Sequence, residues 1–429
     1  MTTDTETAVE PAQMRKVALS GLVGTTLENY DFFIYGTAAA LVFDTLFFPK
    51  SAPDAATLAT FAVFATGFLA RPLGAALFGH LGDRVGRRAM LVSTLILMGI
   101  ATTLIGALPS YASAGVWAPV LLVVLRLVQG VAAGGEWGGA VVITAEHAPP
   151  GKRGFYGGFT QIAAPVSFIL AFLVFLPLTS FLSREQLMAW GWRIPFFLGA
   201  ALVAYGLVIR LSVAESPAFK NAETPARAPF VQAWRTYPGT IVLTAFTVAA
   251  TTAIGYIKNV YLLSYGTQHL GISSSSLLLA ILVNAVVEGV LIMTFARLSD
   301  RVGRKTVFVF GAVVSVLWAV PLMLLVGTKA WILILLALIG SGIGSTAMFA
   351  PLAAFFAEIF SPEVRCSGVS MGYQIGSVLG GGLAPLISAA LFAATGSALS
   401  VSAYIAGLSL ISLLAISRIR ETAPRSAAS

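Results

Sequence analysis

Twelve apolar segments, each of roughly 20 residues, alternate with short polar interruptions along the chain. A helix of about 20 apolar residues is long enough to cross the ~30 Å hydrocarbon core of a bilayer. The pattern therefore predicts an all-α membrane protein with twelve transmembrane helices. Their predicted cores are 17–43, 57–80, 89–109, 117–141, 154–177, 190–213, 239–266, 276–297, 306–327, 330–355, 366–394 and 399–418.

The longest polar interruption divides these segments into six and six. It carries Glu215, Lys220, Glu223, Arg227 and Arg235. We therefore expect a cytoplasmic linker between two six-helix bundles. The predicted organisation is a disordered tail at 1–14, a bundle at 15–213, the linker at 214–238, a bundle at 239–418 and a second tail at 419–429.

A short charged loop occurs once in each half. The loop between the second and third segments contains Asp-Arg-Val-Gly-Arg at 83–87, and the same five residues recur at 300–304, 217 positions later in a chain of 429. A second pair follows the fourth and tenth segments, Glu146 with Arg153 and Glu358 with Arg365. Matched charges at half-chain spacing predict two related halves, which is an arrangement typical of transporters.

Composition supports a membrane location. The chain is 57% hydrophobic and 10% charged, whereas soluble domains carry about 25% charged residues. The single cysteine, Cys366, excludes an intramolecular disulfide, and the three histidines lack the spacing of metal ligands. We therefore expect neither a metal nor any other cofactor.

Lysine and arginine are distributed unevenly across the predicted loops. With the N-terminus inside, 19 of the 26 lie in inner loops and tails, four lie outside and three lie within segments. Cytoplasmic loops carry this excess in membrane proteins. Both termini are thus predicted to be cytoplasmic in a cell inner membrane, and the basic charge indicates topology rather than nucleic-acid binding.

Several motifs point to a family. The two Asp-Arg-Val-Gly-Arg loops resemble the signature loop of the major facilitator superfamily. Residues 28–36 (ENYDFFIYG), 71–74 (RPLG), 134–140 (GGEWGGA) and 190–196 (WGWRIPF) resemble the metabolite:proton symporter family, particularly its shikimate-permease-like branch. The resemblance covers all twelve segments. It implies alternating access between two bundles and uptake of a small organic acid or zwitterion with a proton, by a chain expected to be monomeric.

Two other functions compete with uptake. Antiporters of this superfamily carry a glycine-rich stretch ending in Gly-Pro in the fifth span, but Ala163-Ala164-Pro165 stands here, which disfavours export. A receptor on the same fold would need a signalling domain, and the short loops offer none. An enzyme is not expected, because the sequence contains no nucleotide loop, nucleophile triad or metal cluster.

The repeated loop suggests a gate. Its aspartate can cap a neighbouring helix and pair with arginines while the inner side is closed, and its glycines permit close approach and positive φ. The alternative is a simple topological anchor held inside by its arginines. The candidate gating residues are Gly79, Gly82, Asp83, Arg84, Gly86, Arg87 and Arg88, with Asp300, Arg301, Gly303 and Arg304 in the second copy.

Charged residues inside the apolar segments are the candidates for coupling, since an unpaired charge at mid-bilayer is costly. Glu28 and Asp31 lie three residues apart on one helix face. Two carboxylates so close in a low dielectric resist ionising together, which suits a proton site. The alternative for Asp31 is a permanent ion pair with Arg71 or Arg126. Glu288, near the predicted midplane, is the next proton-coupling candidate.

Arg126 is the predicted anchor for an anionic carboxylate substrate. It lies ten residues before Glu136 on one helix, which places the two side chains about 80° and ~15 Å apart, so they cannot pair directly. Arg126 then faces either the substrate or an acid from another span, with Arg71 as a second cation. Lys258 is expected to snorkel outwards. Further candidate substrate-binding residues are Tyr30, Tyr35, Gln129, Gln161, Glu136, Asn284 and Tyr373.

Overall fold

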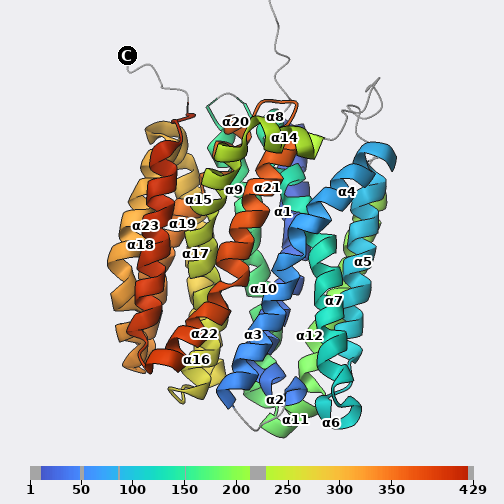
Figure 1. Ribbon diagram of the computed structural model, residues 1–429, viewed down its shortest axis with the longest axis vertical. Coiled ribbons are helices and arrows are strands. Elements are labelled where there is room, and N and C mark those ends of the chain that lie inside the picture. Colours follow the sequence, from blue (N-terminus) through green and yellow to red (C-terminus); the bar gives the residue numbers. More distant parts are fainter. Residues whose placement is uncertain (1–10, 49–52, 86, 150, 213–228, 424–429) are drawn as a thin grey trace, which may run out of the picture.

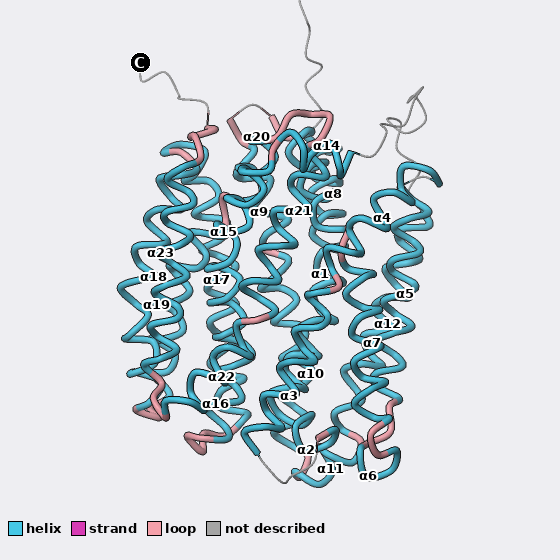
Figure 2. Tube along the Cα trace, viewed as in Figure 1, coloured by secondary structure: helices cyan, strands magenta, loops and turns pink. Residues whose placement is uncertain are grey.

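The computed structural model describes residues 11–48, 53–85, 87–149, 151–212 and 229–423. Their helices run side by side between two loop-bearing ends, and no described residue lies in a β-strand (Figures 1 and 2). The helices group into twelve passes, as the hydrophobic pattern predicts. We call the end that carries Pro11 and the last described residues the upper end, as it appears in Figure 1.

The first half contains six passes. They are α1 (Pro11–Ala38) continued by the π-helical turn η1 (Ala39–Phe43) and α2 (Asp44–Phe47), α3 (Pro53–Leu69) with α4 (Arg71–Val85), α5 (Arg87–Ala107), α7 (Trp117–Ala133) with α8 (Glu136–His147), α9 (Arg153–Gln161) with α10 (Ala163–Phe181), and α12 (Ile194–Ser212). Short helices at the lower end are α6 (Tyr111–Ala114), α11 (Arg184–Ala189) and η2 (Gly191–Arg193).

The second half repeats this plan. Its passes are α15 (Pro238–Tyr256) with the π-helical turn η3 (Ile257–Tyr261) and α16 (Leu262–Gln268), α17 (Ser274–Val302), α18 (Arg304–Gly327), α19 (Trp331–Phe349) with α20 (Leu352–Ile359), α21 (Arg365–Ser377) with the π-helical turn η4 (Val378–Gly382) and α22 (Ala384–Thr395), and α23 (Leu399–Arg418). Helix α14 (Pro229–Thr236) precedes the first of these passes.

Two predicted boundaries differ from the structure. Helix α1 begins at Pro11, inside the segment expected to be a disordered tail, because proline suits the first helical position and strong helix formers follow it. Helix α14 lies inside the predicted linker, because Phe230, Ala233 and Trp234 recur at helical spacing and form one apolar face. Residues 213–228 of that linker lie outside the described residues.

Glycines let backbones meet inside each half. A methyl group at Gly130 would collide with the carbonyl of Gly67, and one at Gly134 would collide with that of Arg71. The dense glycines of the fourth pass therefore let α7 lie directly on α3 and α4. In the second half, Gly376 and Gly380 face the backbone of α15 in the same way. Both glycine ridges are packing surfaces, as small-residue stripes commonly are in membrane bundles.

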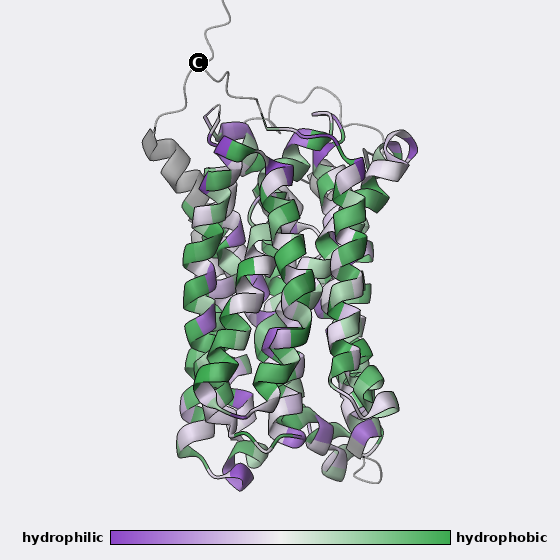
Figure 3. Cartoon of the chain, turned by 90° about the vertical axis from the view of Figure 1, so that its left-hand side faces the viewer, coloured by the Kyte–Doolittle hydropathy of each residue, from purple (hydrophilic) through white to green (hydrophobic). Residues whose placement is uncertain are grey.

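The outer surface is apolar along its middle. In Figure 3 the hydrophobic colour covers the helices, and hydrophilic residues gather at the two ends. Ten described helices are long and apolar enough to cross a membrane, and Val92–Ala107 is a shorter apolar helix. Exposed Leu317, Val290 and Leu414 lie on this surface. The chain is therefore a multi-pass membrane protein.

The two halves stand next to each other. The first half, blue to green in Figure 1, occupies one side of the bundle, and the second half, yellow to red, occupies the other. Helix α10 packs against α17, α8 against α21, and α3 against η4 and α22. The seam between the halves is where a site between two bundles must lie.

Candidate functional site

Arg126 lies at the centre of the first half, with no exposed surface. Its guanidinium donates to Gln129 Oε1 at 2.9 Å and to the backbone carbonyl of Phe64 at 3.2 Å. Its Cζ also lies 3.9 Å from the ring centroid of Tyr35 and 4.7 Å from that of Phe32. Helix spacing explains the Gln129 bond, since residues three apart share a face. Arg126 forms no ion pair with any described residue.

A chain of three hydrogen bonds connects Arg126 to Asp31. Gln129 donates from Nε2 to Thr102 Oγ1 at 2.7 Å, and Thr102 donates from Oγ1 to Asp31 Oδ2 at 2.8 Å. Asp31 is 1% exposed, and its Oδ1 has no hydrogen-bond partner among the described residues. The predicted proton site and the predicted anchor are thus joined through side chains rather than by a direct ion pair.

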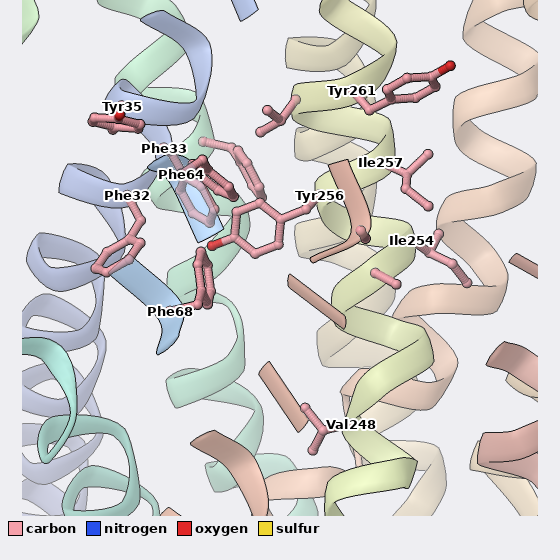
Figure 4. Close-up of a cluster of buried hydrophobic side chains, with 14 of the residues drawn as sticks. Phe32, Phe33, Tyr35, Phe64, Phe68, Val248, Ile254, Tyr256, Ile257 and Tyr261 are labelled. Carbon is pink, nitrogen blue, oxygen red and sulfur yellow. The ribbon is translucent and has the colours of Figure 1, made fainter. Parts of the chain in front are cut away.

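Arg71 lies on the face of the first half that meets the second half. Its Cζ is 3.8 Å from the ring centroid of Phe32 and 4.6 Å from that of Phe68. The Phe68 ring is 5.2 Å from the ring of Tyr256 on α15 (Figure 4). Arg71 is 3% exposed, and its Nε and Nη2 have no partner among the described residues.

Glu28 is close to the same position. Both Glu28 and Arg71 lie near the phenols of Tyr256 and Tyr373 from the second half. Glu28 is 2% exposed and lies one helical turn before Asp31. Arg71 and Glu28 therefore lie near the seam, whereas Arg126 and Asp31 are buried inside the first half.

The second half has its own buried ion pair. Lys258 of η3 is fully buried, where the sequence indicated a snorkelling lysine. Its Nζ forms an ion pair with Glu288 of α17 and donates to Ser345 Oγ of α19 at 3.3 Å. The snorkelling prediction is wrong because the π-helical turn and the packing of α15 direct the side chain between α17 and α19.

The other predicted lining residues separate into two groups. Tyr30 donates to the Pro195 carbonyl at 3.2 Å, and Tyr35 holds its ring under Arg126, so both pack inside the first half. Gln161, Tyr373 and Asn284 lie nearer the seam. Gln161 donates to the Phe349 carbonyl at 2.7 Å. The Tyr373 ring stacks on the Trp137 ring, with 3.6 Å between the two ring centroids. Glu136 is 7% exposed and opens α8, at the upper part of the fourth pass.

At the upper end, the second copy of the repeated loop reaches across the seam. Asp300 accepts the backbone N–H groups of Gly154 and Phe155, both at 2.8 Å, and so caps α9 of the first half. Arg304 donates to Asp300 at 2.6 Å and to Glu358 at 3.3 Å, with its side chain almost fully buried. A carboxylate at a helix N-terminus is favourably placed for both charge and hydrogen bonding.

The remaining residues of this loop have different surroundings. Arg301 is exposed, while Gly303 ends α17 with φ of 103° and lies against Glu421. Glu421 in turn accepts the backbone N–H groups of Arg304 and Lys305. For the first copy, Gly86 and the side chains of residues 79–89 lie outside the described residues. The predicted gating residues Asp83, Arg84, Arg87 and Arg88 fall in that range.

More contacts close the upper half of the seam. Arg365 donates to Glu146 at 3.0 Å, joining the two charge clusters that match between the halves. Gln374 donates to the Gly134 carbonyl at 2.9 Å, and Gly138 lies against Ser370.

The lower end is also closed. Gln268 donates to Asp44 at 2.8 Å and accepts from Thr57 at 3.2 Å, and Ser180 donates to Ser275 at 3.2 Å. With both ends joined and aromatic rings meeting in the middle, the structure is an occluded conformation.

Reasoning from the sequence missed Thr102 and placed Lys258 wrongly. Thr102 bridges Asp31 and Gln129, but a threonine inside an apolar helix carries no signal of its own. Tyr256 meets the aromatic residues of the first half, as Figure 4 shows. Lys258 was noticed and placed wrongly. Its partner, Glu288, is 30 residues away, and no local pattern pairs residues at that distance.

Comparisons with known proteins agree with this architecture. Residues 17–228 match the family model "Sugar (and other) transporter", and residues 241–429 match "Major Facilitator Superfamily". The Escherichia coli (strain K12) inner membrane metabolite transport protein YhjE is 40% identical over 98% of each chain. The shikimate transporter of the same organism is 38% identical over 89% of this chain and 88% of its own.

Solved structures show the same fold. The proton:xylose symporter XylE bound to 6-bromo-6-deoxy-D-glucose superposes with a TM-score of 0.75 at 18% identity, covering 96% of this chain and 97% of that one. Together with the two buried charge clusters and the matched halves, these relationships establish that the chain belongs to the metabolite:proton symporter family of the major facilitator superfamily.

Proposed function

We propose that this transporter takes up a small organic acid together with a proton. The observation that carries the proposal is that two buried cations lack an ion-pair partner among the described residues. Neither Arg71 nor Arg126 forms an ion pair with a described residue, although both are at least nine-tenths buried. A buried cation without a counter-ion is costly in a membrane, and an anionic substrate would supply that counter-ion.

Guanidinium chemistry favours a carboxylate. The planar fork offers parallel donors to two oxygens, which an ammonium group cannot do. Arg71 retains two nitrogens without a partner and Arg126 retains one, among the described residues. Aromatic rings under both guanidiniums stabilise the charge while leaving these donors available. The name of the related shikimate transporter is consistent with such a substrate, so shikimate-like acids and dicarboxylates are our first candidates.

Proton coupling is assigned to Asp31, assisted by Glu28, with Glu288 as the second candidate. The bonds Arg126–Gln129–Thr102–Asp31 support this choice. An anion that binds Arg126 pulls on Gln129 and, through Thr102, changes the hydrogen bonding of Asp31. Binding of the anion and protonation of Asp31 then become mutually dependent, as coupled binding requires.

Access alternates by breaking one set of seam contacts at a time. Inward opening would release the cap that Asp300 provides for α9 and the ion pair between Arg365 and Glu146. Outward opening would release Gln268 from Asp44 and Thr57. The upper end is proposed to be cytoplasmic, because it carries the cationic clusters that the positive-inside rule places there. The proposed location is a cell inner membrane, with both termini inside and a monomer as the working unit.

Purified protein in liposomes provides the test. With an imposed gradient, acidic outside, radiolabelled shikimate, benzoate, succinate, citrate and glycine betaine are offered in turn. We expect accumulation of at least one carboxylate, abolished by a protonophore. Accumulation of betaine alone would overturn the anionic assignment, and efflux against the same gradient would favour the antiporter.

A further inference from the structure

The ion pair of the second half joins three helices. Lys258 comes from η3, Glu288 from α17 and Ser345 from α19. Lys258 has no exposed surface, and Glu288 is 7% exposed. π-Helical turns such as η3 occur frequently at functional sites. The first half contains no equivalent pairing of its intramembrane cations among the described residues, because Arg71 and Arg126 both lack a carboxylate partner.

A second polar side chain points to the same place. Asn284 lies one turn before Glu288 on α17 and is fully buried. A methyl group built on Gly342 of α19 would lie 3.0 Å from Asn284 Oδ1 and 3.2 Å from Glu288 Oε1. Neither amide atom of Asn284 has a hydrogen-bond partner among the described residues. Such an amide is rare in a native interior, and a water, an ion or a polar ligand bound beside it would satisfy its hydrogen bonds.

The internal repeat places this cluster on the inner face of its half. Glu288 precedes Asp300 by twelve residues, and Arg71 precedes Asp83 by the same twelve. The two positions are therefore equivalent in the two halves. Since Arg71 meets Phe68, which contacts Tyr256 across the seam, the equivalent position of Glu288 also belongs to the region between the bundles.

Few other ionisable groups can affect this pair. Helices α10 and α19, which pack against α17, contain none in their sequences. Helix α9 contributes Arg153 and Tyr156, while α18 contributes Arg304 and Lys305, all towards the upper end. Helix α16 contributes Tyr265, and α17 itself carries Arg297, Asp300 and Arg301 at its upper end. Tyr256 and Tyr261 flank Lys258 on α15 and η3. Helix α1, which packs against η3, contributes Glu28, Tyr30, Asp31 and Tyr35.

We propose that Lys258 is a second anion-binding residue, located in the C-terminal half, and that Glu288 is a built-in competitor for it. In the occluded structure the Glu288 carboxylate is paired with the Lys258 ammonium, so Lys258 is not available to another anion. A proton from the outer solution neutralises Glu288, and the carboxylate of the substrate takes its place on Lys258, with the Asn284 amide as an additional donor. On the inner side Glu288 loses the proton, pairs with Lys258 again and displaces the substrate. The inference rests on the proposed function and extends it with a residue and an exchange step.

The test uses exchange of a labelled carboxylate across liposomes at equal pH on both sides. The probe is whichever of shikimate, benzoate, succinate and citrate the wild-type protein accumulates. If the ionised Glu288 carboxylate competes with the substrate for Lys258, the KM of exchange rises by up to about tenfold for each unit of increase in pH. Glu288→Gln mimics the protonated acid. In this variant exchange should persist, and the slope of log KM against pH should fall by about one, because one competing proton-binding group has been removed.

Lys258 is tested in parallel. Lys258→Gln should raise the KM at least tenfold at every pH, and Lys258→Arg should recover much of the affinity. Lys152→Gln, which removes an exposed cation at the upper end, is the matched control and should leave the KM unchanged. If Lys258→Gln alone does not fold, the double variant Lys258→Gln/Glu288→Gln removes both buried charges and should show the same high, pH-insensitive KM.

The outcomes separate the two proposals. A wild-type protein that accumulates none of the carboxylates contradicts the proposed function and this inference together. A wild-type protein that accumulates one, with an unchanged KM in the Lys258 variants or an unchanged pH dependence in Glu288→Gln, contradicts only the inference.

Discussion

Asp300 caps the helix that begins beside Gly154, although the two residues belong to different halves of the chain. Both carboxylate oxygens take part, one accepting from Gly154 and the other from Phe155, each at 2.8 Å. Arg304 holds the same carboxylate from its own helix. One aspartate thus connects the second-half loop to the start of α9 across the seam.

The first prediction concerns this cap. Asp300→Asn removes the negative charge at the N-terminus of α9, an interaction of about 1 kcal/mol, and leaves Arg304 with one acid fewer. We expect the upper end to open more often. Spin labels at exposed Lys152 and Arg301 would show longer distances by double electron–electron resonance. Asp54→Asn, an exposed acid at the first turn of α3, is the control. An unchanged distance distribution would argue against a gating role.

The second prediction concerns the anchor. Arg126→Lys keeps the charge but cannot reach both Gln129 and the Phe64 carbonyl, nor stack as a plane on Tyr35. We expect at least a tenfold rise in the KM of carboxylate uptake with normal expression and membrane insertion. Arg184→Lys, at an exposed position on α11, should behave as wild type. Unchanged affinity in Arg126→Lys would remove Arg126 from the substrate site.

The third prediction concerns coupling. Asp31→Asn retains the hydrogen bond from Thr102 through its amide oxygen but cannot release a proton. Accumulation driven by a pH gradient should fall sharply, because only Glu288 then remains to carry a proton, while exchange of labelled for unlabelled substrate continues. The two assays are run on the same liposomes. If accumulation persists with a normal pH dependence, the proton travels elsewhere, and Glu288 becomes the principal candidate.

The fourth prediction concerns the bridge. Thr102→Val preserves shape but leaves the Gln129 amide and the Asp31 carboxylate each without a partner in a buried site, at a cost of about 1–3 kcal/mol per group. We expect a lower melting temperature and slower accumulation, both recovered by Thr102→Ser. Its neighbour Thr103 only donates to the Gly99 carbonyl of its own helix, so Thr103→Val should have little effect. Equal effects at the two positions would disprove the bridge.

The fifth prediction concerns orientation. In a Cys366→Ser background, a cysteine at Ala222 in the predicted linker should resist an impermeant thiol reagent applied to intact cells. A cysteine at Glu185, exposed on α11 at the lower end, should react. Labelling at Ala222 from outside would reverse the assigned topology.

The sequence alone determined the helical fold class, the division into two halves and the candidate buried charges. Hydrophobic segments of bilayer length can only be helices, because every backbone group must be satisfied within the segment. The repeated Asp-Arg-Val-Gly-Arg loops marked the two halves, and the cost of burying charge drew attention to Asp31, Arg71, Arg126 and Glu288. Each of these conclusions depends on composition or local spacing, which the chain displays before it folds.

Tertiary structure decided which charge meets which partner. Asp31 reaches Arg126 through Thr102 and Gln129, and Lys258 turns inwards to Glu288 rather than outwards to the membrane surface. These contacts join different helices, so they depend on the rotation and depth of each helix in the bundle. Glycine-to-backbone packing and the π-helical turns set those quantities, and a shift of one residue in a helix rotates its side chains by about 100°. Pairing between helices is therefore a property of the packed bundle.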